Sequence, residues 1–442
     1  MRGFLANSAL ALTALAITAA PAWAVAPELD VASVKDAVDA RLDQTYPKLD
    51  ALYKDIHAHP ELGFQETRTA ARLADMMRTE GFEVTTGVGK TGIVALYRNG
   101  PGPTVLVRTE LDALPLQEKT GLSYASFASG LLGGRLTPVD HACGHDAHMA
   151  AWVGTADALV AMKSRWHGTL VFIGQPAEEL VSGARAMLKD GLFTRFPKPD
   201  YGFALHTGPQ AYGNIFYKPG VLTSNADGFK IMFHGRGGHG ASPDATLDPI
   251  VMAARFIEGV QTLVSREKSP SEFGVVTVGS VNSGTVGNII PDQAALSGTI
   301  RSFDPEIRKA LKAGVMRVAN AVAAMSAAPP PEVAFDDGAT AVVNDQALST
   351  RTAQVFKAAF GAKAVLMPRP INPSEDYSEY INAGVPSFYF LIGSADPARV
   401  AAAEAGGPPI PQNHNPGYAP VPEPTIRTGV EAMSLAVVNI MR

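Results

Sequence analysis

The pattern of apolar residues changes between residues 224 and 336, and this change constrains the possible fold more than any other feature of the sequence. On both sides of this segment, short apolar runs of β type alternate with helical stretches, which predicts a mostly parallel α/β sheet. Within it, the predicted order is strand, helix, strand, strand, helix, strand, the pattern of a split βαβ unit. We therefore predict a mixed-sheet α/β domain, formed by residues 25–223 and 337–442, with a ferredoxin-like α+β domain inserted at residues 224–336.

The individual elements are expected where the apolar periodicity matches a helix or a strand. In the α/β domain we expect helices at 28–56, 66–80, 148–163, 183–189 and 345–360, and strands at 92–98, 104–108, 169–174, 363–367 and 386–392. In the inserted domain we expect strands at 227–234, 273–281, 294–303 and 332–335, and helices at 248–267 and 305–325.

The composition excludes several classes of protein. The chain has 442 residues, of which 46% are hydrophobic, so it is too apolar for a disordered protein and long enough for two or three domains. Its single cysteine excludes an intramolecular disulfide and a zinc module built from several cysteines. The formal net charge of −5, with scattered Lys and Arg, gives no basic surface for nucleic acid, and we expect no such partner.

The segment 1–24 has the pattern of a secretory signal. Arg2 precedes an apolar run, Phe4–Ala20, and an Ala-Trp-Ala sequence ends at Ala24, so we expect cleavage there and an exported protein, periplasmic or secreted. The alternative is an uncleaved membrane anchor, which the short run and its polar residues disfavour. No later stretch is long and apolar enough to span a bilayer, so we expect no stable membrane insertion after cleavage.

The strongest local signal for chemistry lies at residues 141–148. This segment holds three of the ten histidines and the only cysteine, and thiolate and imidazole are natural ligands of divalent transition ions. Cys143 and His145 flank a glycine, so a turn can aim both side chains at one point, and Asp146 could orient a ligating imidazole. Two alternatives stay open, a catalytic thiol with a histidine base and an inert buried thiol.

Two adjacent carboxylates, Glu178 and Glu179, follow another apolar strand. One can bind a metal ion while its neighbour acts as a general base, although acidic residues also favour the first turn of an ordinary helix. His206 ends a further apolar run, and His414 lies in a polar loop near the C-terminus. Taken alone, each is more often structural or solvent-exposed, but a two-ion centre needs more than the three ligands found so far.

The inserted segment adds three candidates. His239 lies in a Gly-rich turn, which permits close approach of the backbone to a ligand. Asn288 lies in a loop, and Arg301 follows at the end of a strand. A guanidinium can clamp a carboxylate bidentately, and the alternative for Arg301 is an ordinary surface ion pair.

Six motifs occur in an order that resembles the M20-type metallo-amidohydrolases. They are HACGHD, QPAEE, HGRGGHGASP, NIIPDQAALSGTIR, PSEDYS and HNPGY. IHAHPELGFQE and RTELDALPLQE match the branch that contains N-acyl-amino-acid hydrolases, hippurate hydrolases and plant auxin-conjugate hydrolases. The resemblance covers residues 45–442 and implies a catalytic domain that holds two divalent ions, Zn²⁺ or Mn²⁺, and a smaller lid domain that usually mediates dimerisation.

The resemblance also implies roles in the catalytic domain. The implied metal ligands are Cys143, His145, Glu179, His206 and His414, with Cys143 between the two ions. Glu178 matches the general base of the family.

Other positions match the family with one departure. His239 matches the lid histidine that reaches the developing oxyanion, often in the site of a partner protomer. Asn288 and Arg301 match positions that hold the α-carboxylate of the substrate, and Asp112 matches an acid beside the metal centre. Glu110 stands where the family usually has the shorter Asp, which puts the local packing in question.

The activity that the resemblance implies is hydrolysis of N-acyl or N-aroyl L-amino acids, a small-molecule class that includes hippurate-like amides and aryl amides of phenylalanine such as ochratoxin A. A metallo-dipeptidase or carboxypeptidase of the same superfamily would use the same centre. A hydrolase with a cysteine nucleophile and an exported solute-binding protein are further alternatives. We expect the inserted domain and the loops 118–138 and 394–412 to shape the pocket.

Overall fold

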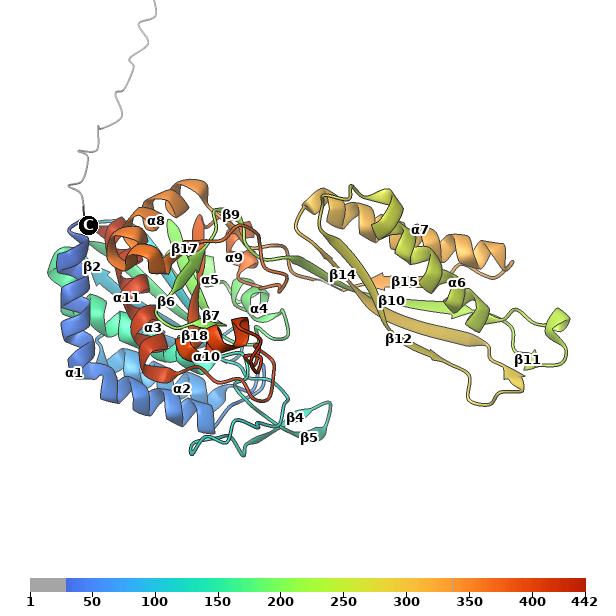
Figure 1. Cartoon of the computed structure of the whole chain (residues 1–442), viewed down its shortest axis with the longest axis horizontal. Coiled ribbons are helices and arrows are strands. Elements are labelled where there is room, and N and C mark those ends of the chain that lie inside the picture. The colour runs from blue at the N-terminus through green and yellow to red at the C-terminus, as the bar shows by residue number, and fades with distance from the viewer. Residues whose placement is uncertain (1–28, 337) are drawn as a thin grey trace, which may run out of the picture.

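The computed structural model describes residues 29–336 and 338–442, so the predicted signal at residues 1–24 lies outside the described residues. Figure 1 shows a large α/β body and a smaller α+β body, which are joined at a narrow neck. At this neck Asn225 pairs with Ser302, at the first residue of β10 (Asn225–His234) and the last residue of β14 (Gln293–Ser302). The predicted fold class, a mixed α/β domain with a ferredoxin-like insertion, is confirmed.

The α/β body is built on one eight-stranded sheet with the strand order β1-β2-β6-β3-β7-β18-β8-β17. Its strands are β1 (Glu83–Val88), β2 (Gly92–Asn99), β3 (Thr104–Glu110), β6 (Gly168–Gln175), β7 (Tyr201–Ala211), β8 (Ile215–Tyr217), β17 (Ala364–Leu366) and β18 (Ser387–Ala395). The central strands β6, β3, β7 and β18 are parallel, and antiparallel pairs attach β2 and β8 on either side. The carboxyl ends of these four strands therefore share one edge of the sheet.

Helices cover both faces of this sheet. One face packs against α1 (Val31–Ala58), α2 (Thr67–Thr79), α3 (His145–Ala161), α8 (Gln346–Phe360) and α11 (Pro422–Met441). The other face packs against α4 (Gly183–Lys189), α5 (Leu192–Arg195) and α9 (Ser378–Asn382). Successive strand residues alternate between the two cores, as when Val105 and Val107 face the first and Leu106 the second.

The inserted body has a four-stranded antiparallel sheet in the order β12-β14-β10-β15. Besides β10 and β14 it contains β12 (Gly274–Ser283), β15 (Glu332–Phe335), α6 (Pro249–Thr262) and α7 (Pro305–Met325). Apolar residues of the strands and of both helices form one core, so the helices cover one face of the sheet. The helix expected at 248–267 is shorter, because the segment Leu263–Glu267 forms a π turn after α6.

Short elements complete the structure. A hairpin of β4 (Ser129–Leu132) and β5 (Arg135–Pro138) projects from the α/β body, and β9 (Gly220–Val221) pairs with β16 (Val343–Asn344). The helix α10 (Pro397–Glu404) follows β18, and β11 (Gly238–His239) pairs with β13 (Ile289–Ile290) at the end of the inserted body away from the neck (Figure 1). No helix within the described ranges is long and apolar enough to cross a membrane.

Candidate metal centre

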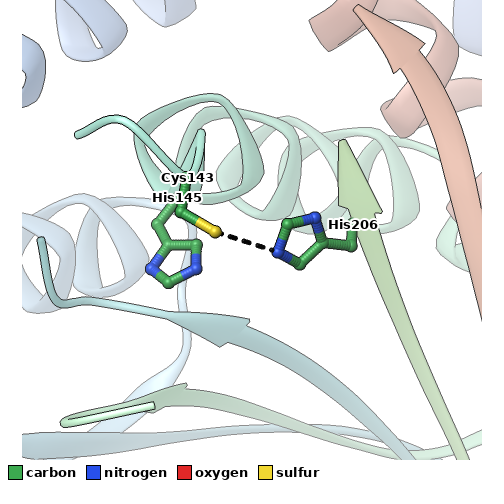
Figure 2. Close-up of side chains that lie close together, drawn as sticks. All are labelled: Cys143, His145 and His206. Carbon is green, nitrogen blue, oxygen red and sulfur yellow. Dashed lines mark hydrogen bonds between the residues drawn. The ribbon is translucent and has the colours of Figure 1, made fainter. Parts of the chain in front are cut away.

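Five side chains predicted to bind metal meet at the carboxyl edge of the central strands. Cys143 and His145 lie at the start of α3, Glu179 follows β6, His206 lies in β7, and His414 lies in the loop before α11. The Cys143 Sγ atom is 3.4 Å from His206 Nε2 and 3.3 Å from His414 Nε2. Figure 2 shows the thiol directed at His206, with His145 beside it.

The local backbone explains how these side chains converge. Gly144 has φ +90°, and a Cβ added there would lie 2.4 Å from the Thr207 hydroxyl oxygen. Only glycine therefore allows the turn that aims Cys143 and His145 at one point. His414 also has a positive φ, 67°, and its backbone N–H donates to the Ala142 carbonyl at 2.8 Å. Such strain in a non-glycine residue is typical of functional sites.

The donor set fits two divalent ions. One group of ligand atoms comes from Cys143, His145 and His206, a second comes from Cys143, Glu179 and His414, and the atoms of each group lie within 4.8 Å of one another. Two ligands on one tetrahedral zinc ion are roughly 3.3–3.5 Å apart, which matches the observed contacts of the thiol. His145 Nε2 and Glu179 Oε1 are buried without a hydrogen-bond partner among the described residues, as metal-ligating atoms should be.

Neighbouring groups orient the imidazoles. His145 Nδ1 contacts the Asp112 backbone carbonyl at 2.8 Å, and His206 Nδ1 contacts the Thr207 carbonyl at 2.7 Å, so both rings turn Nε2 toward the centre. The Asp112 carboxylate also accepts the Glu179 backbone N–H at 3.0 Å. Asp146, for which the sequence suggested an orienting role, contacts a different imidazole: its carboxylate lies 2.6 Å from His57 Nδ1.

Glu178 is the remaining acid at the centre. Its Oε2 lies 3.8 Å from His145 Nε2, and its side chain is almost fully buried. Burial, followed by the negative charges of Glu375 and Glu179, raises the pKa of Glu178 well above its ordinary value. Burial and the neighbouring carboxylates also raise the pKa of the Cys143 thiol, which makes it a poor nucleophile without a bound cation.

A network of buried polar side chains lies next to the centre. Arg108 contacts Glu110 and lies 2.6 Å from Glu375, and Glu110 Oε2 lies 2.9 Å from His148 Nδ1. His148 Nε2 accepts the Thr207 backbone N–H at 2.8 Å, so its proton is on Nδ1 and points to Glu110. Burial raises the pKa of Glu110, but Arg108 and His148 outweigh it and hold the pKa well below its ordinary value. The longer Glu110 is therefore accommodated by the guanidinium of Arg108 and the imidazole N–H of His148.

A cavity of about 600 Å³ opens over the centre. Arg301, at the neck end of β14, lines it and donates from Nη1 to the Ser374 hydroxyl at 2.8 Å. His239 and Asn288 do not line it: they lie side by side at the other end of the inserted body, where the Gly240 N–H donates to the Asn288 carbonyl. The length of β14 separates the two ends by about 30 Å.

The sequence-based prediction of the residues that line this cavity missed some residues and wrongly included one loop. Ser374, Glu375 and Tyr389 line the cavity, although the sequence marked only the motif that contains the first two, PSEDYS, and gave it no role. The loop 118–138 contributes no lining residue, contrary to expectation, whereas the segment 394–412 contributes Gln412.

Comparison with known proteins decides the family. The model of peptidase family M20/M25/M40 matches residues 106–432. The chain belongs to peptidase family M20. This confirms the resemblance drawn from the motifs and makes the protein a metal-binding hydrolase of amide bonds.

Relatives of this M20 enzyme have several amide substrates in their names. The chain is 35% identical to the hippurate hydrolase of Campylobacter jejuni over 77% of this chain and 87% of that protein. It is 33% identical to an N-acetyl-L-cysteine deacetylase of Bacillus subtilis (83% and 86% covered) and 32% identical to thermostable carboxypeptidase 1 of Saccharolobus solfataricus (87% and 93%).

Solved structures share the whole architecture. Bacillus subtilis YXEP protein, a dinuclear metal-binding peptidase of family M20, is 29% identical and aligns with a TM-score of 0.72 over 90% of this chain and 99% of that one. A chain from methicillin-resistant Staphylococcus aureus is 30% identical and aligns with a TM-score of 0.81 over 92% of this chain and 100% of that one.

Proposed function

We propose that this M20 enzyme is a dinuclear amidohydrolase that cleaves N-acyl or N-aroyl L-amino acids to a carboxylic acid and a free amino acid. The proposal rests on the position of Arg301. Its side chain lines the same cavity as Glu178 and the candidate metal ligands Cys143, Glu179, His206 and His414. Its one side-chain hydrogen bond within the described ranges goes to Ser374, and none of the carboxylates described there forms a salt bridge with it. The guanidinium is thus available for the carboxylate of a substrate.

Two ions, Zn²⁺ or Mn²⁺, would be held by the five side chains of the centre, with Cys143 shared between them. When bound, the ions supply Lewis-acid polarisation of the scissile carbonyl and a lower pKa for the attacking water. The thiolate favours zinc, whereas the carboxylate of Glu179 also suits manganese.

Glu178 then acts as the proton carrier. It accepts a proton from the attacking water and delivers it to the leaving nitrogen, which requires a single carboxyl group within reach of both atoms. The buried position of Glu178 beside His145 supports this assignment, because it aims the carboxyl group at the centre and away from bulk water.

The cavity supports a substrate with one carboxylate and one apolar group. Its volume lies in the range of ordinary ligand pockets. Val181, Ile371 and Leu391 add apolar side chains to its lining. Hippurate-like amides and aryl amides of phenylalanine such as ochratoxin A both meet this description.

We further propose that a second copy of the chain completes the site, so that the enzyme works as a homodimer formed through the inserted body. His239 Nδ1 accepts the Ala241 backbone N–H at 3.0 Å, which leaves Nε2–H exposed as a donor for a developing oxyanion. Because His239 and Asn288 lie about 30 Å from the neck of their own chain, they suit the cavity of a partner better. Mixing the single variants Glu178→Gln and His239→Ala should restore activity in hybrid dimers, and failure to do so would argue against a shared site.

Export of the enzyme is also proposed, from the signal pattern of residues 1–24. Fractionation of cells that produce the full chain should place the mature enzyme outside the cytoplasm, starting at Val25. A full-length enzyme in the cytoplasm would refute export.

The central test is Glu178→Gln with the metal content measured in the same preparation. We expect both ions to remain and turnover to fall by roughly 10²–10⁴-fold, the usual contribution of a general base. Near-normal turnover with both ions bound would remove Glu178 from this role.

The second candidate function, a metallo-dipeptidase or carboxypeptidase, draws support from the similarity to thermostable carboxypeptidase 1. Arg301 could hold the C-terminal carboxylate of a peptide equally well. A panel that compares kcat/KM for hippurate, N-acetyl amino acids, ochratoxin A and dipeptides separates the two functions.

A further inference from the structure

A second cluster of metal-ligating side chains lies away from the catalytic cavity. It joins residues from two motifs with one residue beside a third: His57 from IHAHPELGFQE, Glu118 from RTELDALPLQE, and Asp140, which directly precedes HACGHD. One ligand atom of each lies within 4.8 Å of the other two. None of the three lines the cavity over the catalytic centre. We propose that His57, Glu118 and Asp140 form a third divalent-cation site of the chain.

His57 is already oriented as a metal ligand. Its Nδ1 lies 2.6 Å from the Asp146 carboxylate, which fixes the ring and directs Nε2 at the cluster. A carboxylate that holds the distal nitrogen in this way is the usual partner of a metal-bound histidine. The Nε2 atom lies 3.2 Å from Glu118 Oε1, close to the separation of two ligands on one ion and long for a charge-assisted hydrogen bond.

Asp140 supplies the independent observation. Its side chain is fully buried, and both carboxylate oxygens lack a hydrogen-bond partner within the described ranges. Buried polar atoms are nearly always satisfied by protein, water or an ion, so two orphaned oxygens in one group point to something bound there. One of these oxygens lies within 4.8 Å of a ligand atom of both His57 and Glu118.

The charges around the cluster also favour a divalent ion. Asp146, Glu118 and Asp140 surround a single imidazole, and all four side chains are buried. His57 brings at most one positive charge to three carboxyl groups, so an ionised Asp140 is left without a counter-charge, which is a penalty for a buried group. A bound divalent ion removes this penalty and lets all three carboxylates stay ionised.

The donor set defines the class of cation and its role. One imidazole and two carboxylates suit Mn²⁺, Fe²⁺ or Zn²⁺, whereas Ca²⁺ and Mg²⁺ prefer oxygen ligands alone. The ligands come from α1, from the loop after β3 and from the segment after β5. The ion would therefore be structural: it would fasten the segment after β5 to α1 and to the loop after β3, next to the catalytic ligands.

The test counts ions in the full chain. Chelated protein is reloaded with Mn²⁺ or, separately, with Zn²⁺, freed of excess metal, and analysed for metal per chain. We expect three ions in the wild-type protein and two in Asp140→Asn, with amide hydrolysis retained in the variant. Asp75→Asn, which changes an exposed helical carboxylate, is the matched control and should keep three.

The outcome separates this inference from the proposed function. The expected total of three ions per chain rests on the two-ion centre of the proposed function. The difference between the wild type and Asp140→Asn is one ion whether or not that centre holds two. Cys143→Ser should disturb the catalytic centre and leave the ion of the third site in place. Should Asp140→Asn fold poorly, Glu118→Gln removes a different ligand of the same ion and must lose the same equivalent. Equal metal content in the wild type and both variants would overturn the proposal.

Discussion

Arg301→Met provides the sharpest test of the substrate class. The substitution keeps an unbranched stem of similar length and removes the guanidinium that lines the cavity. Arg301 is half-buried, and burial lowers the pKa of its guanidinium, opposed only by the negative charge of Asp227, with which it forms no salt bridge. A substrate carboxylate would supply a salt-bridge partner.

The size of the effect follows from this geometry. A hydrogen bond to a charged group contributes about 1.5–3 kcal/mol, which corresponds to roughly 10–150-fold in kcat/KM. We expect this loss for hippurate and other N-acyl amino acids. When the carboxylate of these amides is replaced by a neutral carboxamide, kcat/KM of the variant and of the wild type should differ by less than about threefold. Neither enzyme can then form the charged interaction with the substrate.

The assay is steady-state hydrolysis of these matched acid and carboxamide pairs. Arg301→Lys should recover only part of the loss, since an ammonium group lacks the planar fork of the guanidinium. Arg255→Met is the control: Arg255 is an exposed arginine of α6 whose one side-chain hydrogen bond in the described part of the chain also goes to a serine hydroxyl, at 3.4 Å. Its loss should leave both substrate types unaffected. Equal losses for the acid and the carboxamide would refute the clamp.

Three further predictions concern stability and metal binding. Arg108→Met leaves buried carboxylates without their cation and should lower the free energy of unfolding by about 3–5 kcal/mol in urea titrations, against less than about 1 kcal/mol for the exposed Arg98→Met. Gly144→Ala forces a Cβ against the Thr207 hydroxyl in a left-handed backbone conformation, which should lower the free energy of unfolding by about 1–2 kcal/mol. The same substitution should weaken metal binding roughly tenfold in titrations of chelated protein. Burial raises the pKa of Asp227, but hydrogen bonds from two basic residues of α7 lower it overall. The ionised Asp227 therefore stabilises the fold fully above about pH 4, the pKa of an unfolded Asp. This stabilisation is lost as the pH falls through the lower pKa that Asp227 has in the folded state. The stability difference between Asp227→Asn and wild type should therefore shrink on acidification below pH 4, as measured by chemical denaturation.

One-sided burial gives a helix a clear periodic signal in the sequence. Helices such as α7 have a polar and an apolar face, and the predicted range 305–325 coincides with the observed one. The final helix, α11, was not predicted, because nearly all its residues from Thr425 onward are buried and it has no polar face to create a periodic signal.

Residue types and spacing located the side chains that gather at the candidate metal centre but not their supports. Cys143 and His145 are close in sequence, whereas Glu110, His148 and Asp140 act through partners that only the folded chain brings together. Asp146 shows the limit of local reasoning: its sequence neighbour is His145, but its hydrogen bond goes to His57, 89 residues away. Sequence spacing predicts which side chains can act as metal ligands. Tertiary packing decides which neighbouring residues orient those ligands.

The charge distribution gives the metal a role beyond catalysis. Arg108 is the buried cation beneath the catalytic centre, and it is already shared by Glu110 and Glu375. Glu178 and Glu179 have only histidines as ion-pair partners within the described ranges. Burial lowers the pKa of His145 to about 3 and holds it neutral, whereas the hydrogen bond to Glu179 raises the pKa of His414, so at most one imidazolium faces the two carboxylates. The fold thus gathers more negative charge than its own cations neutralise. Since isolated buried charges are costly, bound divalent ions must contribute to the folding free energy of this domain as well as to its chemistry.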